Sequence, residues 1–185
     1  ALPIYYNALY QVNNVISIVE DLPESDLRNL IIGEAHYFRA YIYHSLVTRW
    51  GGVPIQRVNT MDKPFRDSEE AVWAFIEEEL ETALAFLGTS SSCYYVSRDA
   101  ALALKARVML ERGKKTEAAA LAEGLIKDGK YKLDSFDKIF RGKTNTEVIF
   151  SFQCLAEESN ITISTLFYTY AHPNHGSYVY RPTND

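Results

Sequence analysis

Cysteine, basic clusters and long apolar runs are all scarce in this sequence, and each shortage excludes a class of protein. The two cysteines, Cys93 and Cys154, lie far apart without the closely spaced Cys and His ligands of a zinc site. The formal net charge of -5 argues against nucleic acid binding, which requires a basic patch. No apolar run approaches the length of a membrane span.

Apolar and aromatic residues are abundant. At 185 residues and 47% hydrophobic content, the chain is long enough to bury a substantial core. The 13 tyrosines and 9 phenylalanines supply core volume and also flat surfaces on which sugar rings stack. We expect most of these aromatic residues to lie in the core.

The strongest pattern is a helix from about Leu27 to Trp50. Apolar residues recur there at three- and four-residue spacing, and a second row lies on a neighbouring face, so partners are expected on several sides. Gly51 can adopt a left-handed conformation and Pro54 cannot continue the helix, so a stop is predicted there. The first row is Leu27, Leu30, Ile31, Ala35, Phe38, Ile42, Leu46 and Trp50; the second is Tyr37, Tyr41, His44 and Val47.

Further helices are predicted on both sides of this one. Residues 3–20 form an amphipathic helix, and residues 68–87 form another after an extended connection over 53–67. Residues 97–129 are predicted to form a helix hairpin that turns at Gly113. This hairpin resembles a tetratricopeptide (TPR) unit in its length and in its pairing of two helices. The fold class predicted is therefore mainly α, a TPR-like superhelix of antiparallel helix pairs.

The sequence also predicts the starts of three helices and one acidic row. N-caps are expected at Ser25 or Asp26, at Ser68, and at Ser97 or Asp99. Four acids on the helix over 68–87 are expected to form a solvated face: Glu77, Glu78, Glu79 and Glu81.

The end of the chain is less regular. A short helix is predicted over 136–140, and the alternation of Val148, Phe150 and Phe152 with other residues predicts a strand over 145–152. After it the periodicity is lost. We expect domain 1–152 to be helical and segment 153–185 to be irregular.

The central helix and its stop resemble the signature of the SusD/RagB family. The residues that carry the resemblance are Gly33-Glu34-Ala35, Phe38-Arg39-Ala40-Tyr41 and Trp50-Gly51-Gly52-Val53-Pro54, with Gly129-Lys130-Tyr131-Lys132-Leu133 further along. The resemblance implies an outer-membrane lipoprotein that binds nutrients, mostly glycans, at the surface of Bacteroidetes-like cells and works with a SusC-type TonB-dependent transporter. It further implies that 153–185 begins a truncated C-terminal region, and that a lipid-bearing cysteine stands upstream of Ala1.

No catalytic residue, metal ligand or cofactor is assigned, and we expect the protein not to be an enzyme. No motif isolates a pair of acids as a glycosidase would need. Glu34 and Arg39 are expected to pair with groups on neighbouring helices. Two pairs of histidines lack a third ligand at a suitable spacing: His36 with His44, and His172 with His175.

A glycan site needs exposed aromatic platforms next to polar groups. Tyr94 and Tyr95 are adjacent in a predicted loop, where both rings cannot easily point inward, and Tyr178 and Tyr180 lie in the irregular tail. These four are the predicted ligand-binding residues. The function predicted is capture of oligosaccharides and their delivery to the transporter; the alternative is a TPR-like scaffold for a peptide or protein, without carbohydrate binding.

Overall fold

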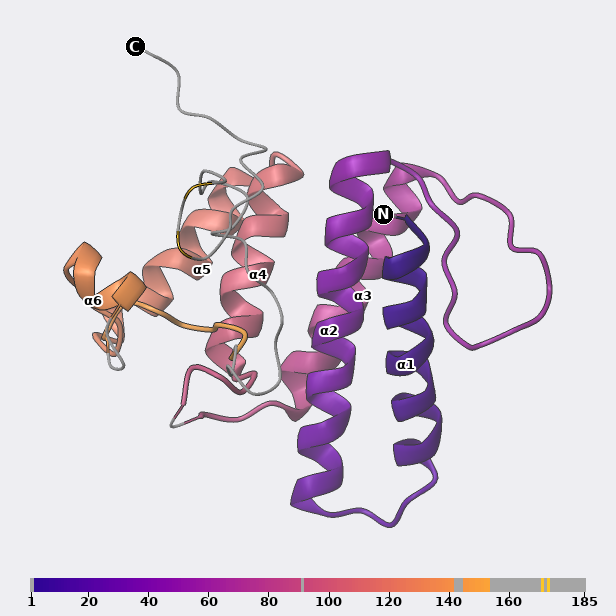
Figure 1. Cartoon of the computed structure of the whole chain (residues 1–185), viewed down its shortest axis with the longest axis horizontal. Coiled ribbons are helices and arrows are strands. Elements are labelled where there is room, and N and C mark those ends of the chain that lie inside the picture. The colour runs from indigo at the N-terminus through magenta and orange to yellow at the C-terminus, as the bar shows by residue number, and fades with distance from the viewer. Residues whose placement is uncertain (1, 91, 142–144, 154–170, 172, 174–185) are drawn as a thin grey trace. The chain divides into compact units, whose positions relative to one another are not determined.

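The computed structural model describes residues 2–90, 92–141, 145–153, 171 and 173, and this part of the chain is mainly helical (Figure 1). Contacts divide the chain into two units, Ala1–Ser151 and Phe152–Asp185. The described helices all lie in the first unit: α1 (Leu2–Glu20), α2 (Asp26–Trp50), α3 (Glu69–Phe86), α4 (Arg98–Glu111), α5 (Lys115–Lys127) and α6 (Phe136–Arg141). The predicted helices are confirmed with small shifts at their ends.

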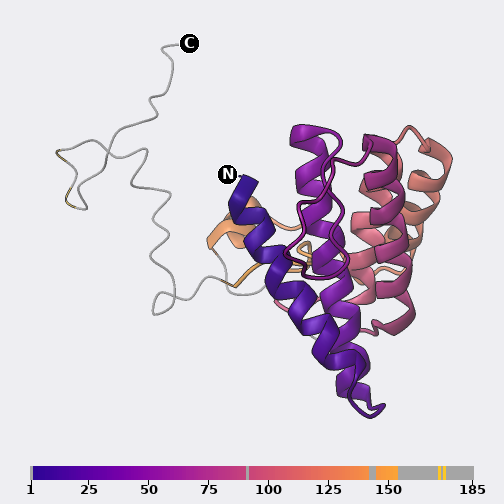
Figure 2. The same ribbon diagram turned by 90° about the vertical axis from the view of Figure 1, so that its right-hand side faces the viewer.

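The first five helices form a TPR-like superhelix. Each packs on the next in sequence, α1 on α2, α2 on α3, α3 on α4 and α4 on α5. Successive helices among these five run antiparallel, as both views show (Figures 1 and 2). Helix α2 packs against both α1 and α3, so it is buried on two sides as its sequence predicted.

A serine hydroxyl caps each of the three helices for which a cap was predicted. Ser25, Ser68 and Ser97 accept hydrogen bonds from backbone N–H groups three residues on, each at 3.2 Å. Each bond satisfies an N–H that the first helical turn leaves without an internal partner. Where the sequence left two candidates, the structure selects Ser25 over Asp26 and Ser97 over Asp99.

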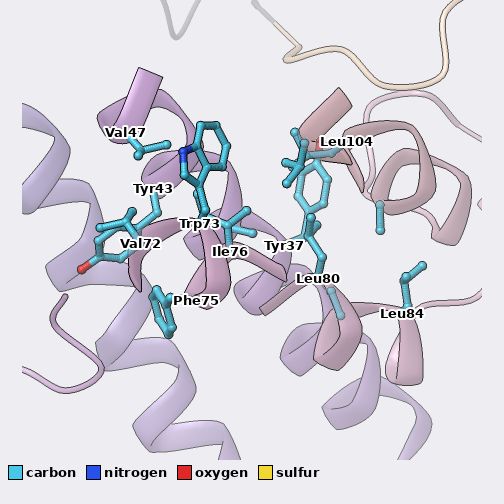
Figure 3. Packing of buried hydrophobic residues seen from close by; sticks show 14 of the residues in the cluster. Tyr37, Tyr43, Val47, Val72, Trp73, Phe75, Ile76, Leu80, Leu84 and Leu104 are labelled. Carbon is cyan, nitrogen blue, oxygen red and sulfur yellow. The ribbon is translucent and has the colours of Figure 1, made fainter. Parts of the chain in front are cut away.

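The hydrophobic core is centred on α2 and α3 (Figure 3). Tyr43 is fully buried and meets Phe75 edge-to-face, with ring centroids 5.0 Å apart. Leu27, by contrast, belongs to the predicted apolar row and is 66% exposed. Periodicity thus identified the helix, but of its fully buried residues Ala40, Tyr43 and Leu46, only Leu46 belongs to the predicted apolar rows.

The expectation of a solvated acidic row on α3 is wrong for Glu79. Its side chain is only 2% exposed, and Arg39 donates to both of its carboxylate oxygens, from Nε at 2.6 Å and from Nη2 at 2.8 Å. Nδ1 of His36 lies 2.8 Å from Oε2. Burial raises the pKa of Glu79, but the hydrogen bonds from His36 and Arg39 outweigh it and leave the pKa below its ordinary value.

The other three acids of the row meet cations nearer the surface: Glu77 with Arg112 and Lys114, Glu78 with Arg57, and Glu81 with Lys105.

The buried Arg39 also fixes the connection between α2 and α3. Its Nη1 donates to the carbonyl of Arg57 at 3.0 Å and to Asn13 Oδ1 at 3.1 Å. Asn13 in turn donates to the carbonyl of Gln56 at 3.1 Å. Residues 53–67 are therefore an ordered connection, bonded along part of their length to side chains of α1 and α2.

The predicted strand over 145–152 is not formed. The described part of this segment is extended or bent without a ladder, and its backbone bonds are isolated ones, from Ser151 N to Cys93 O at 2.9 Å and from Lys132 N to Thr146 O at 2.8 Å. A strand needs a neighbouring edge over several residues, and these two bonds reach two different segments. Alternation of side chains was therefore not enough to specify a sheet.

Among the described residues, no helix combines the length and the apolar character needed to cross a membrane.

Candidate functional site

Two of the predicted binding tyrosines lie in the described part of the chain. Tyr94 and Tyr95 occupy the loop between α3 and α4, where their side chains are 42% and 65% exposed. The expectation that this loop presents aromatic surface is confirmed. Tyr178 and Tyr180 lie outside the described residues.

Tyr94 borders a cavity of about 370 Å³. The cavity is formed where the loop before α4 meets two later segments of the chain, the one after α5 and the one at 145–149. We call it the tyrosine cavity. Its lining combines aromatic, hydroxyl, amide and ammonium groups with two aliphatic side chains: Ser90, Ser92, Cys93, Tyr94, Ser97, Lys130, Tyr131, Asn145, Thr146, Val148 and Ile149.

Hydrogen bonds hold the 145–149 wall in place. The Asn145 side chain accepts from the backbone N–H groups of Glu147 at 3.1 Å and Val148 at 2.8 Å, which is a local turn. The Glu147 carboxylate accepts from the backbone N–H of Asp134 at 2.8 Å. The backbone groups of this wall are thus ordered before any ligand arrives, which reduces the entropy cost of binding.

Asp99 organises another part of the lining. Its Oδ2 accepts from Lys130 Nζ at 2.7 Å and from the Tyr131 hydroxyl at 2.8 Å. Burial raises the pKa of Asp99, but the bonds from Lys130 and Tyr131 outweigh it, and the pKa lies below its ordinary value. Asp99 is therefore ionised at neutral pH and orients both side chains at the cavity.

This arrangement suits a polyhydroxylated ligand. A tyrosine ring offers a flat apolar face to the C–H groups of a sugar, while hydroxyl, amide and ammonium groups bond its oxygens. The volume lies within the usual range of small-molecule sites. Tyr95 is not part of the lining, so the structure assigns the two adjacent rings different positions relative to the cavity.

Sequence reasoning did not assign Lys130, Tyr131 and Asn145 to the site. Gly129 to Leu133 carries part of the family resemblance, and the run from Asn145 is predicted from the sequence to be a strand. Nothing in the spacing showed that they meet the loop before α4, because that contact depends on the return of the chain after α5.

The other candidate residues have structural partners. His36 contacts Glu79, and Nε2 of His44 lies 2.7 Å from Glu111 Oε2. Arg39 pairs with Glu79 on a neighbouring helix as expected. Glu34 instead takes a backbone hydrogen bond from Val96, and burial raises its pKa above the ordinary value. In the described ranges, no group of three or more His, Cys, Asp and Glu side chains is placed to hold a metal.

Comparison with known proteins identifies the family. A sequence model of the SusD-like family, described as "starch-binding associating with outer membrane", matches residues 2–110. The chain belongs to the SusD-like family. The match covers α1 to α4 almost completely, including the signature helix and its Trp50-Gly51-Gly52 stop.

Individual relatives agree with this assignment. A SusD-like protein of Formosa agariphila is 29% identical over 143 residues, which is 74% of this chain and 28% of that protein. A SusD-like protein of Bacteroides fragilis is 28% identical with a TM-score of 0.72, covering 82% of this chain and 33% of that one. NanU of B. fragilis is 25% identical with a TM-score of 0.76, covering 87% and 36%. The chain thus spans about a third of the length of the relatives it matches.

Proposed function

We propose that this SusD-like chain is the helical part of a surface protein that captures oligosaccharides without turning them over. The tyrosine cavity carries the proposal, because it brings Tyr94 and Tyr131 together with Lys130 and Asn145 around a volume of about 370 Å³. The family's description as starch-binding supports glycan as the ligand class. Tyr95, 65% exposed beside the cavity, would provide a further stacking surface.

The proposal also covers the domain division, the cellular location and the transporter partner of the protein. We assign residues 1–152 to the helical domain and 153–185 to an irregular segment, and Tyr178 and Tyr180 of that segment are proposed as further ligand-binding residues. The protein is held at the outer membrane, exposed at the cell surface, by an N-terminal lipid anchor. It passes its ligand to a SusC-type TonB-dependent transporter. The description "associating with outer membrane" supports this location for the family.

Glycan binding can be measured by isothermal titration of the complete mature protein against plant, host and microbial polysaccharides, with the 185-residue chain alongside. We expect one class to bind, and Tyr94→Ala/Tyr95→Ala to weaken binding by about tenfold, because stacking area is lost. Tyr178→Ala/Tyr180→Ala tests the tail in the same way.

A matched control is available on α1. Tyr10 is 51% exposed and lies outside the cavity lining, so Tyr10→Ala should bind like the wild type. Unchanged affinity in both double variants would remove the tyrosine assignments. No binding across the panel would overturn glycan capture in favour of a peptide-binding TPR-like scaffold.

A further inference from the structure

A second cavity lies on a different part of the helical unit. Its volume is about 400 Å³, and it is bounded by α1, by Arg39 of α2 and by residues 57–59 of the connection between α2 and α3. Helix α1 packs on α2, and Figure 1 shows α1 and the connection on one side of α2, with the α4–α5 hairpin on the other. We call this second cavity the asparagine cavity; it shares no lining residue with the tyrosine cavity.

The inner wall of the asparagine cavity is polar and already ordered. Asn13 and Arg39 are only 3% and 5% exposed. Asn59 extends the same network, since its Nδ2 donates to the Tyr10 carbonyl at 3.0 Å and to Asn14 Oδ1 at 2.8 Å. These bonds fix the wall, so a ligand would meet groups whose rotamers are already restricted.

The outer wall retains free hydrogen-bonding capacity. Asn14 uses its carbonyl oxygen for Asn59, which leaves its amide N–H groups available. The exposed Ser17 hydroxyl offers a donor and acceptors, and the exposed Glu20 carboxylate offers acceptors at the same cavity. Val58 adds an exposed aliphatic surface beside them.

The charges of the lining favour a neutral ligand over an anionic one. Arg39 is paired with the buried Glu79, and Arg57 makes two bonds to Glu78, at 2.8 and 2.6 Å. Each guanidinium group of the lining thus already has a carboxylate partner, and the third charged group of the lining, Glu20, is negative. A phosphate, sulfate or uronic acid would be repelled there, whereas a neutral polyol would find donors and acceptors.

We infer that the asparagine cavity is a second binding site for a neutral saccharide unit, separate from the tyrosine cavity. Glu20 and Ser17 accept hydrogen bonds from the ring hydroxyls, and the Asn14 amide donates to a sugar oxygen. The described residues that line this cavity include no aromatic ring, so the aliphatic Val58 takes the place of an aromatic platform and contacts the C–H face. The inference shares only its ligand class with the proposed function, and it assigns a different set of residues.

Methyl NMR of the full chain tests the two sites separately. Ile16 and Val58 report on the asparagine cavity, and Val148 and Ile149 report on the tyrosine cavity. The probes are maltohexaose, cellohexaose and mannohexaose, with hexagalacturonate as the anionic counterpart. We expect at least one neutral probe to shift the Ile16 and Val58 methyls saturably, and hexagalacturonate to leave them unmoved.

Variants on the exposed face of α1 complete the test. Ser17→Ala/Glu20→Ala should weaken the response of the Val58 methyls about tenfold, because hydrogen bonds to the sugar are lost, and Ser17→Trp should abolish it by filling the cavity. Asn7→Trp, exposed on the same helix and outside this lining, is the matched control and should respond like the wild type.

Each outcome separates the two assignments. A response of Val148 and Ile149 without Ile16 and Val58 overturns the second site and leaves the proposed function intact. The reverse pattern supports the second site and removes the tyrosine cavity. A Val58 response that survives Ser17→Trp, or one given by hexagalacturonate, overturns the inference.

Discussion

Replacing Glu79 with glutamine should lower the free energy of unfolding by about 3–5 kcal/mol, the usual cost of breaking a buried ion pair from one side. The substitution keeps the shape of the side chain but removes the charge that faces Arg39, whose side chain is 6% exposed. Arg39 would then remain as a buried cation without its counter-ion. Urea denaturation followed by circular dichroism measures the change.

Glu78 provides a matched control one residue away. Its pair with Arg57 is exposed on both sides, at 53% and 55%, so Glu78→Gln should cost at most about 1 kcal/mol. The two variants carry the same chemical change at adjacent positions of α3. Equal losses of stability would contradict the conclusion that burial decides the value of the pair.

The effect of Glu79→Gln should also depend on pH. The pKa of Glu79 in the folded protein lies below its ordinary value of 4.5, so its contribution to stability is fully present above about pH 4.5. That contribution is lost as the pH falls through the lower, folded-state pKa. The difference in stability between wild type and Glu79→Gln should therefore shrink in acid, and a constant difference down to the acid transition would contradict the assignment.

Replacing Gly52 with alanine should cost at least about 2 kcal/mol, because the turn after α2 has no space for a side chain. A Cβ atom at this position would lie 2.2 Å from the Asp67 carbonyl oxygen and 3.0 Å from the Glu69 backbone nitrogen. Both neighbours are backbone atoms, so relief requires movement of the connection or of the start of α3. The melting temperature and the urea midpoint of Gly52→Ala report the loss.

Gly124 is the control with the opposite sign. It lies inside α5, and a Cβ atom there would meet nothing within 4 Å. Gly124→Ala should stabilise the protein by about 0.5–1 kcal/mol, because alanine loses less backbone entropy in a helix. If both variants destabilised the protein similarly, crowding at Gly52 would not be the cause.

Local sequence signals predicted the helices well, because the interactions that specify them lie within a few residues. The apolar period of α2, the serine caps and the stop at Gly51 all involve neighbours in the chain, and Gly51 does take a positive φ of 67°. The exposure of Tyr94 and Tyr95 followed from similar local reasoning, since two adjacent rings cannot both point into a core.

Residues that act through distant partners were predicted less well. Glu79 looks identical to Glu78 in the sequence, and only the packing of α3 on α2 places it against Arg39, 40 residues away. The extended segment over 145–152 carried the alternation of a strand but met no edge with which to pair. The roles of Lys130, Tyr131 and Asn145 at the tyrosine cavity likewise depend on contacts across the fold.

The sequence by itself determined the helical architecture and the family resemblance, since periodicity, caps and the Trp50-Gly51-Gly52 stop are encoded in short stretches. The tertiary structure alone decided which acid is buried, how the connection between α2 and α3 is fixed, and which side chains enclose the two cavities. The physical reason is that burial and the pairing of charges depend on contacts between segments far apart in the chain, which a local pattern does not specify.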